Sequence, residues 1–318
     1  MRSAEEFVAA AYEALLGRGP DKSGLAHYVP AIASGQLDPA DLLRILAGSG
    51  EAKSRFVPPA PPPGPSLPPA SDALEQGRRD PLAALDQAIA ALHAAGHLRP
   101  DQRAYAEVHR LRFAENAHAI ASLLRDSSDW PACRVLEVGS SVTPLLYHQM
   151  LPGLRLHSLD LFDHAELDGI VDSQIRLDLE KTDVRGAATL PFADMHMVLF
   201  CEVLEHMVVN PANMFRALAA GLAPGGLLYV TTPNFYRRNV RRLIAAGQNP
   251  QPLYPEAYGP ESRFHHHVRE YTMAELLDAM RAAGLQVEVA WYSDCWDAPD
   301  PGLPVEERQN LVVVGRRG

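Results

Sequence analysis

The chain has 318 residues, 47% of them hydrophobic, and a formal net charge of −10. The length fits one domain of about 200 residues with a smaller second unit. The acidic balance disfavours a nucleic-acid partner, because binding a polyanion needs clustered Lys and Arg. No window approaches the roughly 18 uninterrupted apolar residues of a membrane span.

The N-terminal part of the chain is expected to form a small helical module. Apolar residues at helical spacing predict helices over residues 5–18 and 38–47, the second of which opens at an Asp-Pro pair. Glu5 and Glu6 lie inside the first apolar stretch, where a secretory signal would have a basic flank. We therefore expect a cytoplasmic protein.

A proline-rich segment separates this module from the rest of the chain. Residues 57–69 read VPPAPPPGPSLPP, which cannot hold a helix or a central strand because proline has no N–H to donate. Such a segment is a semi-rigid linker. The predicted domains are a helical module at 1–56, a linker at 57–71 and a larger domain at 72–318 with a helical extension at 72–129.

The larger domain begins with helices and then alternates short apolar runs with helical stretches. Helical spacing predicts helices over 73–95 and 101–125. The alternation from residue 134 onward is typical of an α/β fold, in which helices cover both faces of a mostly parallel sheet. The predicted strands are 134–138, 154–159, 175–177, 197–201, 227–231, 287–292 and 311–315.

Ligands of such sheets bind beyond the carboxyl ends of the strands. Gly139 follows the first strand, where a residue without Cβ allows close approach of a backbone or ligand, and Thr143 with Pro144 is a plausible N-cap and first helical residue. Asp160 ends the second strand, where a carboxylate can accept both hydroxyls of a ribose. Asp178 follows the third. The chain has neither GxGxxG nor GxxxxGK[ST], which argues against a nicotinamide dehydrogenase and a phosphate-cradling nucleotidase.

Two further segments combine acids and histidines. Residues 202–206 read EVLEH, and residues 264–272 read FHHHVREYT. If a helix begins at Glu202, then Glu202, Glu205 and His206 share one face and can bind one cation together. Mixed oxygen and imidazole ligands suit manganese, iron or zinc as well as magnesium.

An apolar run ending in Glu-x-x-Glu-His, followed by a Pro-Gly-Gly turn into another apolar run at 227–231, resembles the class I S-adenosylmethionine-dependent methyltransferases, and most closely the ubiquinone-type O-methyltransferases. The resemblance implies a Rossmann-like seven-stranded sheet whose last two strands form an antiparallel hairpin at one edge. It implies S-adenosyl-L-methionine as the cofactor. The cofactor-binding residues implied are Glu137, Gly139, Ser140, Ser141, Asp160, Leu161, Asp178, Leu179 and Cys201.

The magnesium-dependent members of that family, including small-RNA ribose methyltransferases, use Glu-x-x-Glu-His to hold a metal that also binds substrate hydroxyl oxygens. In the RNA enzymes a further His comes from a segment resembling His-x-x-Glu-aromatic-Thr, which here begins at His267, with His265 and His266 as alternates. The resemblance thus implies a divalent metal, magnesium or another. The implied metal ligands are Glu202, Glu205, His206 and His267. The candidate catalytic residues are His206 and His267, either of which can serve as the general base at neutral pH if no metal is bound.

The expected activity is O-methylation of a small hydroxylated acceptor, a sugar, glycan or natural-product precursor in preference to a quinone or phenol. This preference rests on the polar insertion at 237–263 and on an aromatic content of only 7%. Two alternatives stay open. The cofactor loop keeps one glycine where the family has two or three, which would suit a non-catalytic interaction protein; methylation of the 3′-end ribose of RNA is disfavoured by the acidic charge.

Two features bear on partners. The pattern YxxLLGRxPDxxGLxxY at 12–28 resembles a short helical domain of unknown function related to phycobilisome-linker repeats, which implies a protein partner for residues 1–56. Four arginines also cluster at 237–242, where they either form a solvated helix face or attract an anionic group of the substrate.

Overall fold

The computed structural model describes residues 3–52, 70–125, 132–140, 142–181, 190–251, 266–296 and 300–318. The chain divides into two units, Met1–Ser66 and Leu67–Gly318. Among the described residues no helix is both long enough and apolar enough to cross a membrane.

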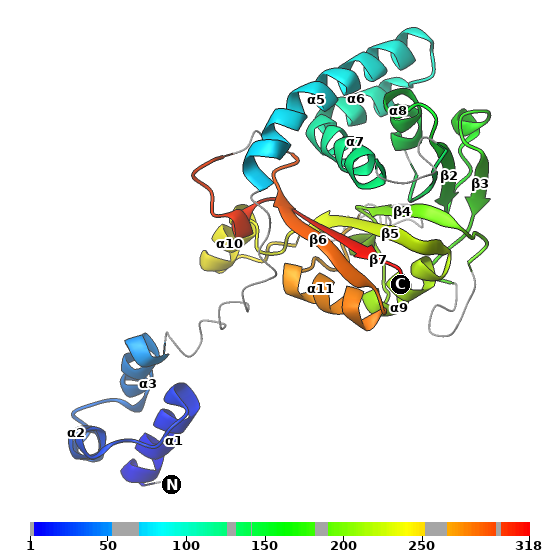
Figure 1. Ribbon diagram of the computed structural model, residues 1–318. Coiled ribbons are helices and arrows are strands. Elements are labelled where there is room, and N and C mark those ends of the chain that lie inside the picture. Colours follow the sequence, from blue (N-terminus) through cyan, green and yellow to red (C-terminus); the bar gives the residue numbers. More distant parts are fainter. Residues whose placement is uncertain are drawn as a thin grey trace. The chain divides into compact units, whose positions relative to one another are not determined.

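The first unit contains the helices α1 (Ala4–Leu16), α2 (Lys22–Ala33) and α3 (Pro39–Gly48) (Figure 1). α1 and α3 confirm the predicted helices. α2 was not predicted, because it carries Gly24 and Pro30, which both disfavour helix interiors. Gly24 is required by packing, since a Cβ there would lie 2.4 Å from the hydroxyl oxygen of Tyr12.

The second unit is built on a seven-stranded sheet with the order β3-β2-β1-β4-β5-β7-β6. The strands β1 to β5 pair in parallel, and β7 is antiparallel to both β5 and β6. This is the predicted methyltransferase-type sheet with an antiparallel hairpin at one edge. Its strands are β1 (Arg134–Val138), β2 (Arg155–Asp160), β3 (Ser173–Arg176), β4 (Met195–Cys201), β5 (Leu222–Pro233), β6 (Gln286–Ser293) and β7 (Asn310–Arg316).

Helices cover both faces of this sheet (Figure 1). Ile120 and Tyr147 pack with Leu199 and Tyr229 on one face, whereas Phe215 packs with the strand residues of the other. On the first face lie α5 (Ala70–Ala94), α6 (Pro100–Val108), α7 (Arg110–Leu124) and α8 (Thr143–Met150), and on the second lie α9 (Pro211–Ala220) and α11 (Met273–Ala282). The remaining described elements are α10 (Arg238–Ala245) and the 3-10 turns η1 (Ala165–Leu167), η2 (Leu204–His206) and η4 (Val305–Glu307).

The helix predicted over 101–125 is broken at His109, whose φ of −98° and ψ of 18° separate α6 from α7. α7 is tied to the sheet by buried polar contacts. The hydroxyl of Tyr229 donates to Asn116 Oδ1 at 2.9 Å, and Trp291 Nε1 donates to a carboxylate oxygen of Glu115 at 2.8 Å. Because buried polar groups must be paired, these contacts fix α7 against β5 and β6.

We propose that the proline-rich segment separates two independently folding units. A chain that begins at Ser71 should then stay soluble and keep its cofactor affinity, because the core of each unit is made by its own residues. Gel filtration and calorimetric titration test this. Aggregation of the shortened chain, or a loss of affinity above about tenfold (about 1.4 kcal/mol), would show that the units are energetically coupled.

Candidate functional site

A cavity of about 880 Å³ opens at the carboxyl ends of β1, β2 and β4. Predicted site residues that line it are Gly139, Ser140, Asp160, Leu161, Asp178, Leu179, Glu202, Glu205, His206 and His267. Glu137 and Cys201 are not among its lining residues. Ser141 and His265 lie outside the described residues.

Gly139 directly follows β1 and lines the cavity. Its φ is +76°, in the left-handed region, and its N–H donates to the carbonyl of Leu159 at 2.9 Å. A Cβ at this position would lie 2.4 Å from Cγ2 of Val203, in the segment that follows β4. Glycine is therefore required both by the backbone conformation and by the close approach of the β4 segment.

Gly139→Ala is expected to destabilise the second unit by more than the roughly 1–3 kcal/mol of left-handed strain, because a contact with Val203 is added. Gly284→Ala is the matched control, since Gly284 has φ +84° with open space around its would-be Cβ. Urea unfolding compares the two. If both variants lost the same free energy of unfolding, the added contact with Val203 would contribute nothing to the destabilisation.

Thr143 does not have the predicted role. The helix α8 has Val142 as its N-cap without a side-chain cap bond, and the hydroxyl of Thr143 instead donates to Oε1 of Glu137. The other carboxylate oxygen of Glu137 is buried and has no hydrogen-bond partner among the described residues. Burial raises the pKa of Glu137 to about 8. Glu137 thus does not line the cavity, and its side chain contacts the first residue of α8 instead.

Asp160 lies at the end of β2 with its side chain 11% exposed. Its Oδ1 accepts from the N–H of Phe162 at 2.9 Å, and Nε2 of His164 lies 3.5 Å from its Oδ2. The carboxylate of Asp160 beside the ring raises the pKa of His164 despite its partial burial. The carboxylate is held by these neighbours on the cavity wall.

Asp178 lies two residues beyond the end of β3. Its Oδ1 accepts from the N–H of Glu180 at 3.1 Å, and Lys181 Nζ lies 2.9 Å from its Oδ2. Asp178 therefore shapes its own turn, and the buried Leu179 between these residues also contributes to the cavity wall.

One side of the cavity comes from helical residues that carry no recognised motif. Gln102, Tyr105, His109 and Arg112 recur at helical spacing on a face of the predicted 101–125 helix, and that spacing was the available signal. His109 lies at the α6–α7 break, and burial lowers its pKa to about 4. The lining residues missed from the sequence include Arg99, Gln102, Tyr105, His109, Arg112 and Trp296.

Glu202 does not join the predicted metal ligands. Its Oε2 lies 3.2 Å from Nη1 of Arg112, and both side chains are largely buried, at 11% and 7% exposure. Its Oε1 accepts from the side chains of Thr231 at 2.8 Å and Asn310 at 2.9 Å. The condition that a helix begins at Glu202 is not met, because the φ of Glu202 is +56° and the chain then forms the 3-10 turn η2.

Glu205, His206 and His267 do come together, with one ligand atom of each within 4.8 Å of the others. Two backbone bonds bring the segments together, because the carbonyl of Glu205 accepts from the N–H groups of Val268 at 2.6 Å and Arg269 at 3.2 Å. The His206 and His267 ring centroids are 4.8 Å apart.

The Glu205 side chain has no exposed surface. Its Oε2 accepts from Thr232 Oγ1 at 2.9 Å, and its Oε1 has no hydrogen-bond partner among the described residues and lies 3.9 Å from Nε2 of His206. Burial and the nearby Glu202 raise the pKa of Glu205 well above its usual range. A buried oxygen without a partner beside two imidazoles fits a cation.

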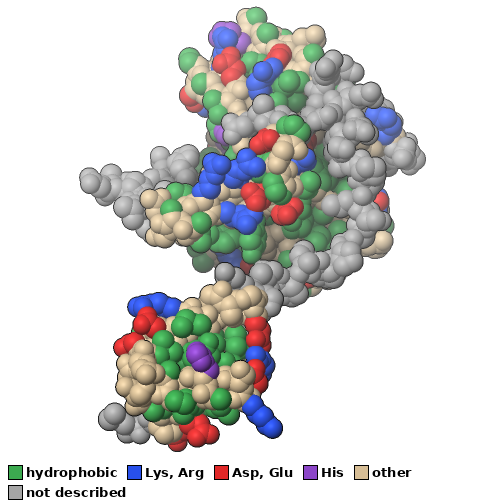
Figure 2. Space-filling model, turned by 90° about the vertical axis from the view of Figure 1, so that its left-hand side faces the viewer, with side chains coloured by type: hydrophobic (Ala, Val, Ile, Leu, Met, Phe, Trp, Pro, Cys, Tyr) green, Lys and Arg blue, Asp and Glu red, His purple; other side chains and the backbone are tan. Residues whose placement is uncertain are grey.

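The arginine cluster at 237–242 does not line the cavity. Basic side chains of α10 lie next to acidic side chains of the segment at 300–307 (Figure 2). Arg238 pairs with Asp300 at 3.0 Å, Arg241 pairs with Glu307, and the side chain of Arg237 turns inward to Glu270. Of the two interpretations, these pairs favour a structural face over an attractor of an anionic substrate group.

Comparison with known proteins places residues 108–289 in a family described as a methyltransferase domain, and residues 2–56 in a domain of unknown function, DUF4214. A ubiquinone biosynthesis O-methyltransferase of Marinobacter nauticus is 30% identical over 160 residues, which are 48% of this chain and 64% of that protein. One from Bordetella bronchiseptica is 32% identical over 117 residues, 36% of this chain and 46% of that protein. The chain therefore spans less than two thirds of these relatives.

Among solved structures, an S-adenosylmethionine-dependent methyltransferase of Thermotoga maritima is 18% identical and covers 69% of this chain and 95% of its own, with a TM-score of 0.45. The 1,6-didemethyltoxoflavin-N1-methyltransferase of Burkholderia thailandensis, also 18% identical, covers 69% and 91% with a TM-score of 0.39. The methyltransferase match spans more than half of the 318 residues. The chain thus belongs to the methyltransferase-domain family.

Proposed function

We propose that the protein is an O-methyltransferase that transfers a methyl group from S-adenosyl-L-methionine to a small hydroxylated acceptor. One observation carries the proposal: Gly139 and Asp160 line the same cavity as Glu205, His206 and His267. Such a cavity can hold a donor and an acceptor side by side, which is the main requirement of a bimolecular transfer.

The cofactor would be held at the ends of β1 and β2. Gly139 allows close approach of the cofactor to the backbone, and the carboxylate of Asp160 can accept the two ribose hydroxyls. S-adenosyl-L-methionine supplies an electrophilic methyl group whose leaving group is a neutral thioether. The chain therefore has chiefly to align the acceptor hydroxyl and to remove its proton.

The acceptor end suits a divalent metal held by Glu205, His206 and His267. The unpartnered buried Oε1 of Glu205 supports this fit, and so do the two imidazoles beside it. With Glu202 engaged by Arg112, two nitrogen ligands and one oxygen remain, a set that suits manganese, iron or zinc at least as well as magnesium. A metal bound there would lower the pKa of a coordinated hydroxyl.

A metal-free route uses the same residues. His206 Nδ1 faces the carbonyl oxygen of His266 at 3.1 Å, and His267 Nδ1 faces a carboxylate oxygen of Glu270 at 2.9 Å. Since both partners are acceptors, each Nδ1 donates and each neutral ring presents Nε2 as the basic atom. Either histidine can then accept the acceptor's proton near neutral pH.

The acceptor class we favour is a sugar, glycan or natural-product precursor. The support is the polar insertion at 237–263, of which 252–263 lie outside the described residues, and the low aromatic content of 7%. A screen for labelled methyl transfer to hydroxylated sugars and phenols tests this choice. Transfer to phenols alone would contradict it.

For the first unit we propose a protein-binding role, because the residues that line the cavity all come from the second unit. The competing proposal, a non-catalytic protein, rests on the single glycine of the cofactor loop. It predicts no turnover with any acceptor.

Asp160→Ala is expected to weaken binding of S-adenosylhomocysteine by about 1.5–3 kcal/mol, the scale of hydrogen bonds to a charged group. Asp163→Ala is the matched control, because Asp163 is exposed and pairs with Arg176 at 2.7 Å. Titration calorimetry measures both. Equal affinities of the two variants would remove Asp160 from the cofactor site.

A further inference from the structure

We propose that Arg237 is a positioning residue that holds the imidazole of His267 in place through Glu270. The inference rests on the proposed function, because it concerns the His267 end of the same cavity. It adds two residues that do not line the cavity and that lie in different segments: Arg237 directly precedes α10, and Glu270 precedes α11.

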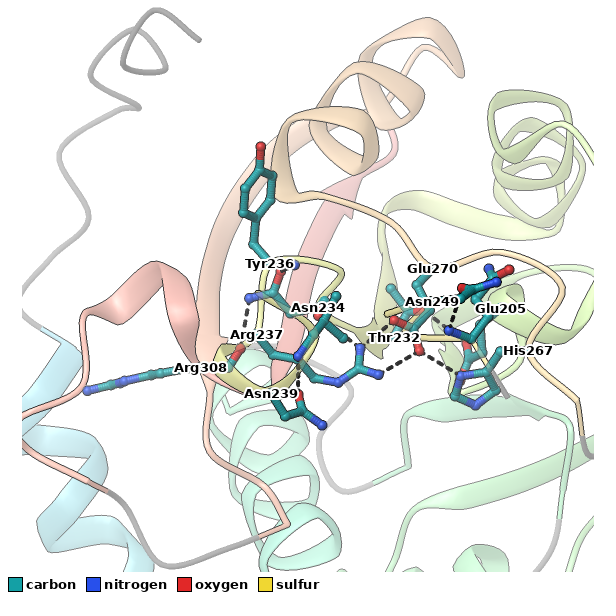
Figure 3. A network of polar contacts seen from close by, with 12 residues as sticks. Glu205, Thr232, Asn234, Tyr236, Arg237, Asn239, Asn249, His267, Glu270 and Arg308 are labelled. Atoms are coloured by element: carbon teal, nitrogen blue, oxygen red, sulfur yellow. Dashed lines mark hydrogen bonds and ion pairs between the residues drawn. The ribbon is translucent and has the colours of Figure 1, made fainter. Parts of the chain in front are cut away.

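The contacts form one continuous chain (Figure 3). Nδ1 of His267 donates to Oε1 of Glu270 at 2.9 Å. Arg237 donates to the same carboxylate with two nitrogens, Nη2 to Oε1 at 2.9 Å and Nη1 to Oε2. The Arg237 and Glu270 side chains are only 13% and 9% exposed. A bidentate pair of this kind fixes the plane of the carboxylate as well as its position.

The carboxylate decides what His267 presents to the cavity. An ionised carboxylate only accepts hydrogen bonds, so the proton of a neutral His267 stays on Nδ1 and the lone pair of Nε2 remains available toward Glu205 and His206. A carboxylate behind a histidine fixes both the tautomer and the ring orientation, and also makes the ring a stronger ligand or base.

Arg237 is itself held on a rigid part of the fold. Its Nη1 also donates to the carbonyl of Asn234 at 3.0 Å. Asn234 is buried at the end of β5, where its side-chain nitrogen donates to the carbonyls of Glu306 at 2.9 Å and Arg308 at 2.7 Å. An N–H of the next residue, Phe235, donates to the carbonyl of Tyr271 at 3.0 Å. Through Arg237 and Glu270, the position of His267 is therefore coupled to the carboxyl end of β5.

The experiment compares Arg237→Gln with Arg237→Lys, which keeps the charge but loses the two-point contact. Arg242→Gln is the control, because Arg242 is an exposed arginine of the neighbouring helix. The first readout is the imidazole ¹⁵N spectrum of His267, assigned with His267→Gln, which reports the tautomer without any metal. The second is the calorimetric affinity for Co²⁺, and the third is the affinity for S-adenosylhomocysteine.

In the wild type we expect His267 to carry its proton on Nδ1. Arg237→Gln should mix the two tautomers and lower Co²⁺ affinity about 10-fold, the lower end of the effect of losing the partner of a metal-binding histidine, because Glu270 itself is kept. Arg237→Lys should fall between, and cofactor affinity should stay within about twofold in every variant. If Arg237→Gln does not fold, Arg237→Lys decides by the same readouts.

Two outcomes overturn the inference: a proton on Nε2 of His267 in the wild type, or an unchanged tautomer together with unchanged Co²⁺ affinity in the Arg237 variants. Failure of the proposed metal site looks different. If the metal site is wrong, His206→Ala would leave Co²⁺ affinity unchanged as well. The tautomer of His267 in the Arg237 variants would then still test the role of Arg237.

Discussion

Replacing His206 by alanine should reduce methyl transfer at least about 100-fold, because the acceptor hydroxyl loses either a ligand of its metal or its general base. Affinity for S-adenosyl-L-methionine should stay within about twofold, since the cofactor is proposed to bind at Gly139 and Asp160. A single-turnover assay with an acceptor found by screening measures the first, and calorimetry measures the second. His148→Ala is the control, because His148 is an exposed histidine of α8 outside the cavity.

A chelator separates the two routes. Loss of activity that returns with added metal, together with inactivity of Glu205→Gln, supports the metal site. Turnover that resists the chelator, with Glu205→Gln active and His206→Ala inactive, supports His206 as the general base. Activity of His206→Ala near that of His148→Ala would show that the acceptor binds elsewhere.

Arg112→Met should destabilise the second unit by about 3–5 kcal/mol, because it leaves the buried carboxylate of Glu202 without its cation. Urea unfolding followed by tryptophan fluorescence measures this, since Trp130, Trp291 and Trp296 all belong to the second unit. The double variant Arg112→Met/Glu202→Gln should recover part of the loss, as the uncompensated charge is removed.

Arg110→Met is the matched control for this prediction. Arg110 lies two residues before Arg112 on α7. Its ion pair with Asp86 at 2.5 Å is exposed, so its loss should lower the free energy of unfolding by no more than about 1 kcal/mol. If Arg112→Met and Arg110→Met had the same free energy of unfolding, the buried pair would contribute nothing beyond a surface contact.

The sheet was largely predictable because most of its strands are short apolar runs between polar turns, although β3 reads SQIR. The predicted strand 134–138 coincides with β1, whereas β5 starts at Leu222, five residues before the predicted start. Leu222 pairs with Met195 across a register shift, and Gly225 adopts φ +74°. A Pro-Gly-Gly sequence predicts a turn. It becomes part of β5 only because the strand pairs with β4 on both sides of the register shift.

The cofactor end of the cavity was predictable from topology alone, since parallel strands bring their carboxyl ends to one edge. The acceptor end was only partly so. Glu205, His206 and His267 converge as the motifs suggested, but Glu202 has a left-handed backbone and faces Arg112 from α7. Partners more than 80 residues apart leave no local signal in the sequence. Arg237 and Glu270 are 33 residues apart, and their contact likewise follows from no local pattern in the sequence.

The most direct test of the central claim is a crystal structure of the protein with S-adenosylhomocysteine. We expect the nucleoside in the cavity between Gly139 and Asp160, with both ribose hydroxyls at hydrogen-bonding distance from the Asp160 carboxylate and the sulfur directed toward the Glu205, His206 and His267 cluster. A cavity that stays empty at saturating ligand, or a nucleoside bound away from Asp160, would contradict the proposed site.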